Sequence, residues 1–181
     1  MSPAADPVFL STLYDMASMA RHTEAIYEGI FPLTEDDSYY EYCSVQNLFI
    51  EHRLLSFAPI TAQEESVRIT CILFVNTCLV RGFPRSAAIL QNGVRFLRDA
   101  VERSLKQDDW KPYQDILFWI TFVGAFCTEA DAEDRFFFTE FSKLKALLGL
   151  SVEEHARTLL ASLFYVERIY GERFSELWNA E

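Results

Sequence analysis

The chain has 181 residues, of which 50% are hydrophobic and 15% aromatic, and its formal net charge is −11. A chain of this length is expected to form one domain with a sizeable core. With only 6 Gly and 6 Pro, it lacks the turn residues of an all-β protein. Its acidic balance excludes nucleic-acid binding that relies on electrostatic attraction to the chain as a whole.

The charge is unevenly distributed along the chain. Residues 1–66 carry eleven acidic and two basic side chains, whereas residues 81–106 carry six basic and two acidic ones. The basic segment is either the solvated face of a helix or a docking patch for an acidic partner. Because the net charge is negative and no DNA-binding motif is present, we expect no direct DNA binding by this chain.

The first two helices are expected over residues 8–30 and 39–57. Residues 1–7 are expected to form a flexible N-terminus, and segment 29–38, with its proline and acid cluster, is expected to be a loop. Pro59 ends the second helix because the residue before a proline avoids the helical conformation. One face of that helix carries Val45, Leu48, Phe49 and His52.

The third helix is expected to begin at a capping box formed by Thr61 and Glu64. In a capping box, the side chain of each of the two residues accepts a hydrogen bond from the backbone amide of the other. This helix is expected to run to about residue 81 and to be central, because it is apolar all round. Gly82 can end it, and Pro84 fits the first turn of the next helix. The apolar stripe of that next helix consists of Leu90, Val94, Leu97, Val101 and Leu105.

The longest apolar run of the chain, Ile116 to Cys127, belongs to a helix that Asp108 or Asp109 caps, with Pro112 in its first turn. Because it is apolar on every side, we expect this helix to lie at the centre of the domain. Gly124 inside it costs about 1 kcal/mol relative to Ala, and a close helix–helix contact is the expected compensation.

The last third of the chain is divided by glycines and acidic turns. Acids between Asp131 and Asp134 favour a helix start, and Gly149 ends that helix. Segment 151–154 is a second capping box that is expected to open a helix to Tyr170, which Gly171 closes. A short terminal turn that packs on the core contains Phe174, Leu177 and Trp178. The sequence therefore predicts an all-α fold, with residues 8–181 forming a single helical bundle-like domain of about seven helices around the central apolar helix.

The four cysteines lie in apolar surroundings, as buried free thiols do. Cys71 and Cys78 are seven residues apart on one helix, so their Cα atoms lie about 10.5 Å apart, too far for a disulfide. This pattern suits a reducing compartment. No signal peptide is recognisable, so secretion is not expected, and the longest apolar run is too short to span a membrane.

Motifs for catalysis, cofactor binding and metal binding are absent from the sequence. The histidines, His22, His52 and His155, lie on different expected helices and are interpreted as surface or half-buried residues rather than ligands. No cofactor is expected. A dispersed active site remains an alternative, because several acids flank the apolar helix beside aromatic residues whose environment can raise a carboxyl pKa. These acids are Asp115, Glu129, Asp131 and Asp134.

The run Arg135, Phe136, Phe137 and Phe138 is the candidate interaction site. Successive helical positions turn by about 100°, so three adjacent rings cannot all face one core. Core packing explains some of the rings. We expect at least one of them to be exposed, and to lie at a self-association interface or at the mouth of an apolar pocket.

Six blocks between about residues 42 and 178 resemble the fungal-specific transcription factor domain, the regulatory domain that lies C-terminal to binuclear zinc clusters. They include the long apolar helix with its embedded glycine and the arginine–aromatic element after it. The blocks are residues 51–56, 65–76, 116–125, 135–138, 148–154 and 177–178. The zinc cluster itself, with its six closely spaced cysteines and basic region, is absent.

The resemblance implies a non-enzymatic helical domain for transcription regulation, which acts through protein contacts or a homodimer and can respond to an apolar small-molecule effector. It implies a nuclear protein, with a cytoplasmic location also open. The alternative is a stand-alone protein of fungal secondary metabolism that binds or converts an apolar small molecule. A third possibility is a structural subunit or inhibitor that pairs with a full-length regulator.

Overall fold

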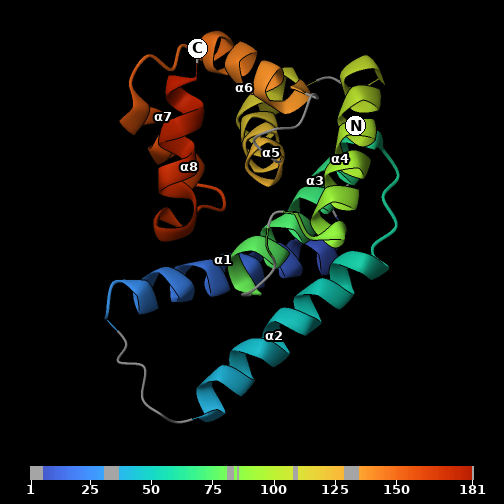
Figure 1. Cartoon of the computed structure of the whole chain (residues 1–181). Helices are drawn as coiled ribbons and strands as arrows, with labels where there is room; N and C mark the ends of the chain where they lie inside the picture. The colour runs from blue at the N-terminus through green and yellow to red at the C-terminus, as the bar shows by residue number, and fades with distance from the viewer. Residues whose placement is uncertain are drawn as a thin grey trace.

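The structure is a computed structural model that describes residues 6–30, 37–80, 84, 86–107, 110–128 and 135–180, with residues 37–40 described as backbone only. In these ranges the chain forms eight α-helices, one π-helical turn and one 3-10 turn, without a strand (Figure 1). The expected all-α bundle is therefore confirmed. None of the described helices is both long enough and apolar enough to cross a membrane.

Helices α1 (Pro7–Tyr27) and α2 (Asp37–Ser56) form an antiparallel hairpin that opens towards its connecting loop (Figure 1). Asp6 caps α1, its Oδ1 accepting hydrogen bonds from the amides of Val8 at 2.7 Å and Phe9 at 3.3 Å. Of the terminus expected to be flexible, residues 1–5 lie outside the described residues. The Phe9 and Phe57 rings stack at 4.3 Å, and Arg53 pairs with Asp15 at 2.6 Å, which joins the closed end of the hairpin.

Helix α3 (Ala62–Phe74) begins at the predicted capping box, in which the Glu64 amide donates to Thr61 Oγ1 at 3.0 Å. It continues as a π-helical turn, η1 (Val75–Leu79), which ends where the Val80 amide donates to the Val75 carbonyl at 2.8 Å. At the end of this turn, the Leu79 carbonyl accepts a hydrogen bond from Asn47 Nδ2 of α2 at 2.9 Å. Residues 81–83, including the expected stop at Gly82, lie outside the described residues.

Helix α4 (Ala88–Gln107) begins later than the sequence suggested. Pro84 does not lie in its first turn. It precedes the helix, in a turn closed by the Ala87 amide and the Pro84 carbonyl at 2.8 Å. The expected apolar stripe is buried at Leu90, Leu97 and Val101, but the stripe ends there, because Leu105 is 41% exposed.

Helix α5 (Gln114–Cys127) is the centre of the fold, as predicted: every residue from Leu117 to Cys127 is buried. It lies between α3 and α4 on one side and α6 (Phe136–Leu147) and α8 (Glu167–Asn179) on the other (Figure 1). Pro112 belongs to a separate 3-10 turn, η2 (Lys111–Tyr113), which precedes α5. The expected capping acids Asp108 and Asp109 lie outside the described residues.

Gly124 makes the close helix–helix contact that its presence in α5 predicted. The Phe137 ring of α6 covers it so closely that a Cβ built on Gly124 would lie 2.6 Å from ring atom Cε1. The C-terminal end of α6 is marked by Gly149, which has a φ of +64°. The amides of Gly149 and Leu150 donate back to carbonyls of the last turn, a typical left-handed helix end. The acidic start expected at residues 131–134 lies outside the described residues.

The prediction of a single helix from segment 151–154 to Tyr170 is wrong. The chain forms two helices there, α7 (Glu153–Ala161) and α8, and Val152 occupies the cap position without a side-chain bond, so the second capping box does not form. The break occurs where the Phe164 carbonyl leaves the helical ladder and accepts a hydrogen bond from Trp119 Nε1 at 2.9 Å. Gly171 lies buried inside α8 rather than at a helix end, and the expected terminal turn is part of this helix.

Candidate functional site

The three adjacent rings after Arg135 point in different directions, as successive helical positions must. Phe137 is 3% exposed and packs on Gly124. Phe136 and Phe138 are half-buried and lie beneath guanidinium groups: Arg98 of α4 is 5.4 Å from the Phe136 centroid, and Arg173 of α8 is 5.6 Å from that of Phe138.

Arg135 itself is exposed and lies 5.8 Å from the Phe138 centroid, so the structure does bring Arg135 and Phe138 together. Cation–π contacts of this kind cover part of the two half-buried rings within the chain. The four residues do not line either of the grooves described below. A role of this segment in self-association or ligand binding stays a prediction.

An exposed apolar surface lies where α2 and α4 flank α3. The space between them is a groove of about 860 Å³, here named the α2–α4 groove. Ile69 and Ile72 of α3 form its floor. Leu55 of α2 forms one wall, and Ile89 and Phe96 of α4 form the other. The two walls are unusually open: Leu55 and Phe96 are each 60% exposed, and Ile89 is 49% exposed.

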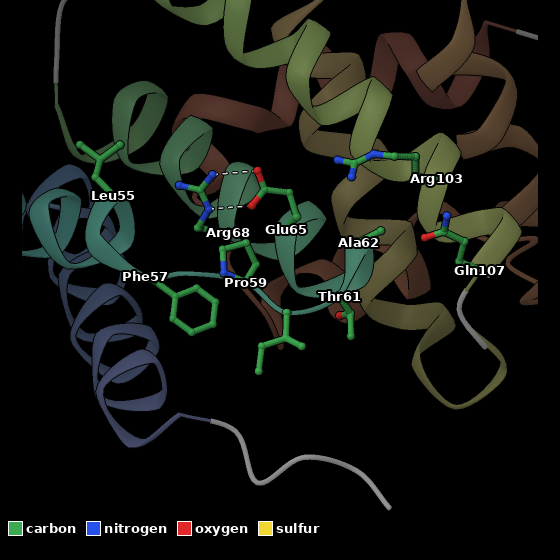
Figure 2. Close-up of a pocket in the computed structure, with 10 residues that line it drawn as sticks. Leu55, Phe57, Pro59, Thr61, Ala62, Glu65, Arg68, Arg103 and Gln107 are labelled. Carbon is green, nitrogen blue, oxygen red and sulfur yellow. Dashed lines mark hydrogen bonds and ion pairs between the residues drawn. The ribbon is translucent and has the colours of Figure 1, made fainter.

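A second hollow of about 440 Å³ extends the groove past the end of α2. Figure 2 shows it between Leu55 and Phe57 on one side and Arg103 and Gln107 of α4 on the other. It shares four lining residues with the α2–α4 groove, so the two hollows form one continuous furrow along α4. These shared residues are Leu55, Glu65, Arg68 and Arg103.

Charged side chains of both signs line this furrow. Near the middle, Arg68 and Glu65 neutralise each other through two hydrogen bonds of 2.8 and 2.9 Å. Towards the start of α4, Glu51 adds an acidic side chain, whose Oε1 accepts from Asn76 Nδ2 at 3.1 Å. Towards the end of α4, the lining contains two acids, Asp99 and Glu102, and two bases, Arg103 and Lys106. Glu102 accepts a hydrogen bond from Arg98 at 2.8 Å, so that end of the furrow carries charges of both signs.

Helix α2 is apolar on two opposite sides, but the body of the protein covers only one. Among residues 41–56, the buried side chains are Asn47, Ile50 and Leu54. The outer side carries large apolar side chains that are 40–63% exposed: Tyr42, Val45, Leu48, Phe49 and Leu55. The face that the sequence singled out through Val45, Leu48, Phe49 and His52 is thus the outward one. Leu55 belongs both to this outer side and to the furrow, and exposed apolar surface of this kind usually marks an interaction site.

The buried hydroxyl of Tyr170 has a partner within the core. The Tyr170 hydroxyl lies 3.0 Å from Thr77 Oγ1 of the π-helical turn. Burial raises the pKa of Tyr170 well above its ordinary value and raises the pKa of the Cys78 thiol to about 12. Burial likewise raises the pKa of Cys71. These thiols stay protonated near neutral pH, which makes them poor nucleophiles, and none of the four cysteines forms a disulfide in the structure.

Arg157 forms the densest polar cluster, at the junction of α7 and α8. Its guanidinium bonds Glu153 at 2.7 Å, Glu167 at 2.6 Å and Ser175 at 2.7 Å, and it lies 4.9 Å from the Phe174 ring centroid. Hydrogen bonds from Arg157 and Ser175 lower the pKa of Glu153. The donors of Arg157 are engaged by these groups, and the cluster joins α7 to α8.

Within the described residues, no group of three or more His, Cys, Asp or Glu side chains is gathered as a metal site requires. In comparisons with known proteins, no family model, no curated protein and no solved structure matches the chain. The assignment of a function therefore depends on the surface itself.

Proposed function

We propose that the chain is a non-enzymatic regulatory domain that works through protein contacts, and that the α2–α4 groove is its main binding surface. The supporting observation is the exposed apolar wall formed by Leu55, Ile89 and Phe96 over an apolar floor. Grooves of this kind between helices bind the apolar face of an amphipathic partner helix. The resemblance to the fungal-specific transcription factor domain points to the same class of activity, regulation of transcription.

The alternative, a protein that binds or converts an apolar small molecule, is supported by the size of the groove. A volume of about 860 Å³ lies within the range of small-molecule sites, roughly 300–1,000 Å³. Such sites, however, bury most of the ligand surface, whereas the wall residues Leu55 and Phe96 are each 60% exposed. An open furrow of this shape suits a helix better than an enclosed small molecule.

A reporter assay tests this proposal. The full chain is fused to an unrelated DNA-binding module, and transcription from a matching promoter is compared with that of the module alone. We expect the fusion to change reporter output, and Phe96→Ser in the groove to remove that change. Leu147→Ser is the matched control, because Leu147 on α6 is 63% exposed but lies outside the groove. Equal output from the wild-type and Phe96→Ser fusions would contradict the proposal.

A further inference from the structure

Part of the charge along the α2–α4 groove is already neutralised within the chain. Glu65 and Arg68 are joined by the two hydrogen bonds that Figure 2 draws as dashed lines. Glu102 pairs with Arg98 at 2.8 Å. Pairs of this kind need no opposite charge from a bound molecule, so they give the groove little preference for a partner of either sign.

Towards the end of α4, the remaining charges are of mixed sign. Asp99, Arg103 and Lys106 line this part of the groove. Residues three or four positions apart are neighbours on a helix surface, so Arg103 lies between Asp99 on one turn and Lys106 on the next. A partner of either sign finds an opposite charge here, and this end of the groove does not select between them.

Glu51 of α2 lies at the opposite end of the groove. Asn76 Nδ2 donates both to Glu51 Oε1 at 3.1 Å and to the Ile72 carbonyl at 2.9 Å, which places Glu51 level with the end of α3. The first turns of α4 lie across from the same point, because a Cβ built on Gly93 would be 2.8 Å from Leu73 Cδ2. Glu51 therefore lies beside the apolar floor, at the end of the groove where α4 begins.

The carboxylate of Glu51 is not matched by a cation. Glu51 is half-buried and forms no ion pair within the described residues, and only one of its oxygens accepts a hydrogen bond there. Arg68 is engaged by Glu65, and the other basic residues that line the groove lie towards the end of α4. A partner that covered Glu51 without a cation would bury an unpaired charge, which is costly. A basic side chain would instead form a charge-assisted hydrogen bond with this carboxylate.

We infer that the occupant of the groove is an amphipathic helix of a partner protein with a basic residue, Lys or Arg, at the end of its apolar stripe, where this residue pairs with Glu51. The inference rests on the proposed function, because it specifies the partner of the same surface. The wall residues Ile89 and Phe96 are seven positions apart on α4, about 10.5 Å or two helical turns. The partner's stripe accordingly presents three apolar positions, at i, i+3 or i+4, and i+7. The net charge of −11 favours the approach of a basic partner.

Synthetic helices test this charge preference with the full chain. The probes are alanine-based, stapled helical peptides with leucine at positions i, i+4 and i+7, and with Lys, Gln or Glu one turn before or one turn after that stripe. By fluorescence polarisation, we expect the tightest-binding Lys peptide to bind about tenfold more tightly than its Glu counterpart, with the Gln peptide between them. High salt should reduce the difference. Phe96→Ser should weaken the binding of every peptide about tenfold or more, because it removes an apolar wall of the groove.

Glu51→Gln isolates the charge. This variant keeps the oxygen that accepts from Asn76 Nδ2, so its stability in urea should equal that of the wild type. We expect it to reduce the preference for Lys over Glu peptides to about twofold or less. Glu172→Gln, the same change at an exposed residue of α8, is the matched control and should keep the full preference. Equal binding of Lys and Glu peptides to the wild type, or a preference that survives Glu51→Gln, would overturn the inference.

The inference and the proposed function fail in distinguishable ways. Reporter output that depends on Phe96 but not on Glu51 retains the groove as a binding surface and overturns the basic partner. Reporter output that depends on Phe96, with no binding of any peptide, likewise overturns the inference and leaves the proposed function standing. A peptide preference that depends on Glu51, with a reporter that neither substitution affects, retains the binding preference and refutes the regulatory role.

Discussion

Substitution of Gly124 by alanine tests the central contact of the fold. In an isolated helix, Gly→Ala is stabilising by about 1 kcal/mol. Here the added Cβ would lie 2.6 Å from Cε1 and 2.7 Å from Cγ of the Phe137 ring. Phe137 is only 3% exposed, so its ring cannot move aside without displacing α6 from α5.

Overpacking of a core costs about 1–3 kcal/mol, and the contact with several atoms of a rigid ring favours the upper part of that range. After subtraction of the helix-propensity gain, we expect Gly124→Ala to destabilise the chain by about 1–2 kcal/mol. At about 2–4 °C per kcal/mol for this chain length, the melting temperature should fall by about 2–8 °C, measured by circular dichroism together with urea unfolding.

The background variant Phe137→Ala provides the control for this reasoning. It removes the ring and should by itself cost about 3–5 kcal/mol. In that background the same Gly124→Ala change should become stabilising, because only the helix-propensity gain and some refilling of the cavity remain. If Gly124→Ala is stabilising with Phe137 present, or destabilising without it, the contact does not determine the effect and the reasoning is refuted.

Two further predictions concern the core and the α7–α8 junction. Trp119 is 2% exposed and donates to the Phe164 carbonyl, so Trp119→Ala should lower the free energy of unfolding in urea by about 3–5 kcal/mol; a loss below about 1 kcal/mol would place α5 outside the main core. The pKa of Glu153 is lowered in the folded chain, so its stabilising contribution is present above about pH 4.5 and is lost as the pH falls through the lowered value. Glu153→Gln should therefore make the free energy of unfolding fall less steeply with acidification than in the wild type, and equal slopes would show that the Arg157 cluster does not stabilise the fold.

The sequence predicted the central part of the fold because its signals there are local. An apolar run without a polar side identifies α5 as buried, the glycine within it indicates a close neighbour, and the Thr61–Glu64 capping box marks the start of α3. Each of these features depends on residues within one or two helical turns of each other. The structure confirms all three.

The break between α7 and α8 could not be predicted in this way. At the break, Trp119, which lies 45 residues earlier in the chain, donates to the Phe164 carbonyl, a contact that no local sequence pattern indicates. Segment 151–154 satisfies the capping-box pattern, but Ser151 lies before the cap position, which Val152 occupies. Local propensity therefore suggested one long helix, whereas the structure has two.

The candidate surface was only half predictable. The sequence placed Val45, Leu48 and Phe49 on one face of α2, which is correct. Because the opposite face of α2 also carries apolar residues, the pattern did not indicate which of the two faces the body of the protein would cover. The groove also needs α4 beside α2, an arrangement that no pattern in either helix specifies. For the same reason the arginines above Phe136 and Phe138 were not foreseen, since Arg98 and Arg173 come from distant helices.

The one-sided anchoring of α2 also bears on local unfolding. A helix that Ile50 and Leu54 hold to the body, with Asn47 tied to the π-helical turn, opens at a lower free energy than a helix buried on every side, such as α5. Any molecule that covers the outer face of α2 binds only the closed form, and so shifts this local equilibrium by mass action. Binding at this face and closure of α2 are therefore linked: a molecule bound there would raise the free energy needed to open α2.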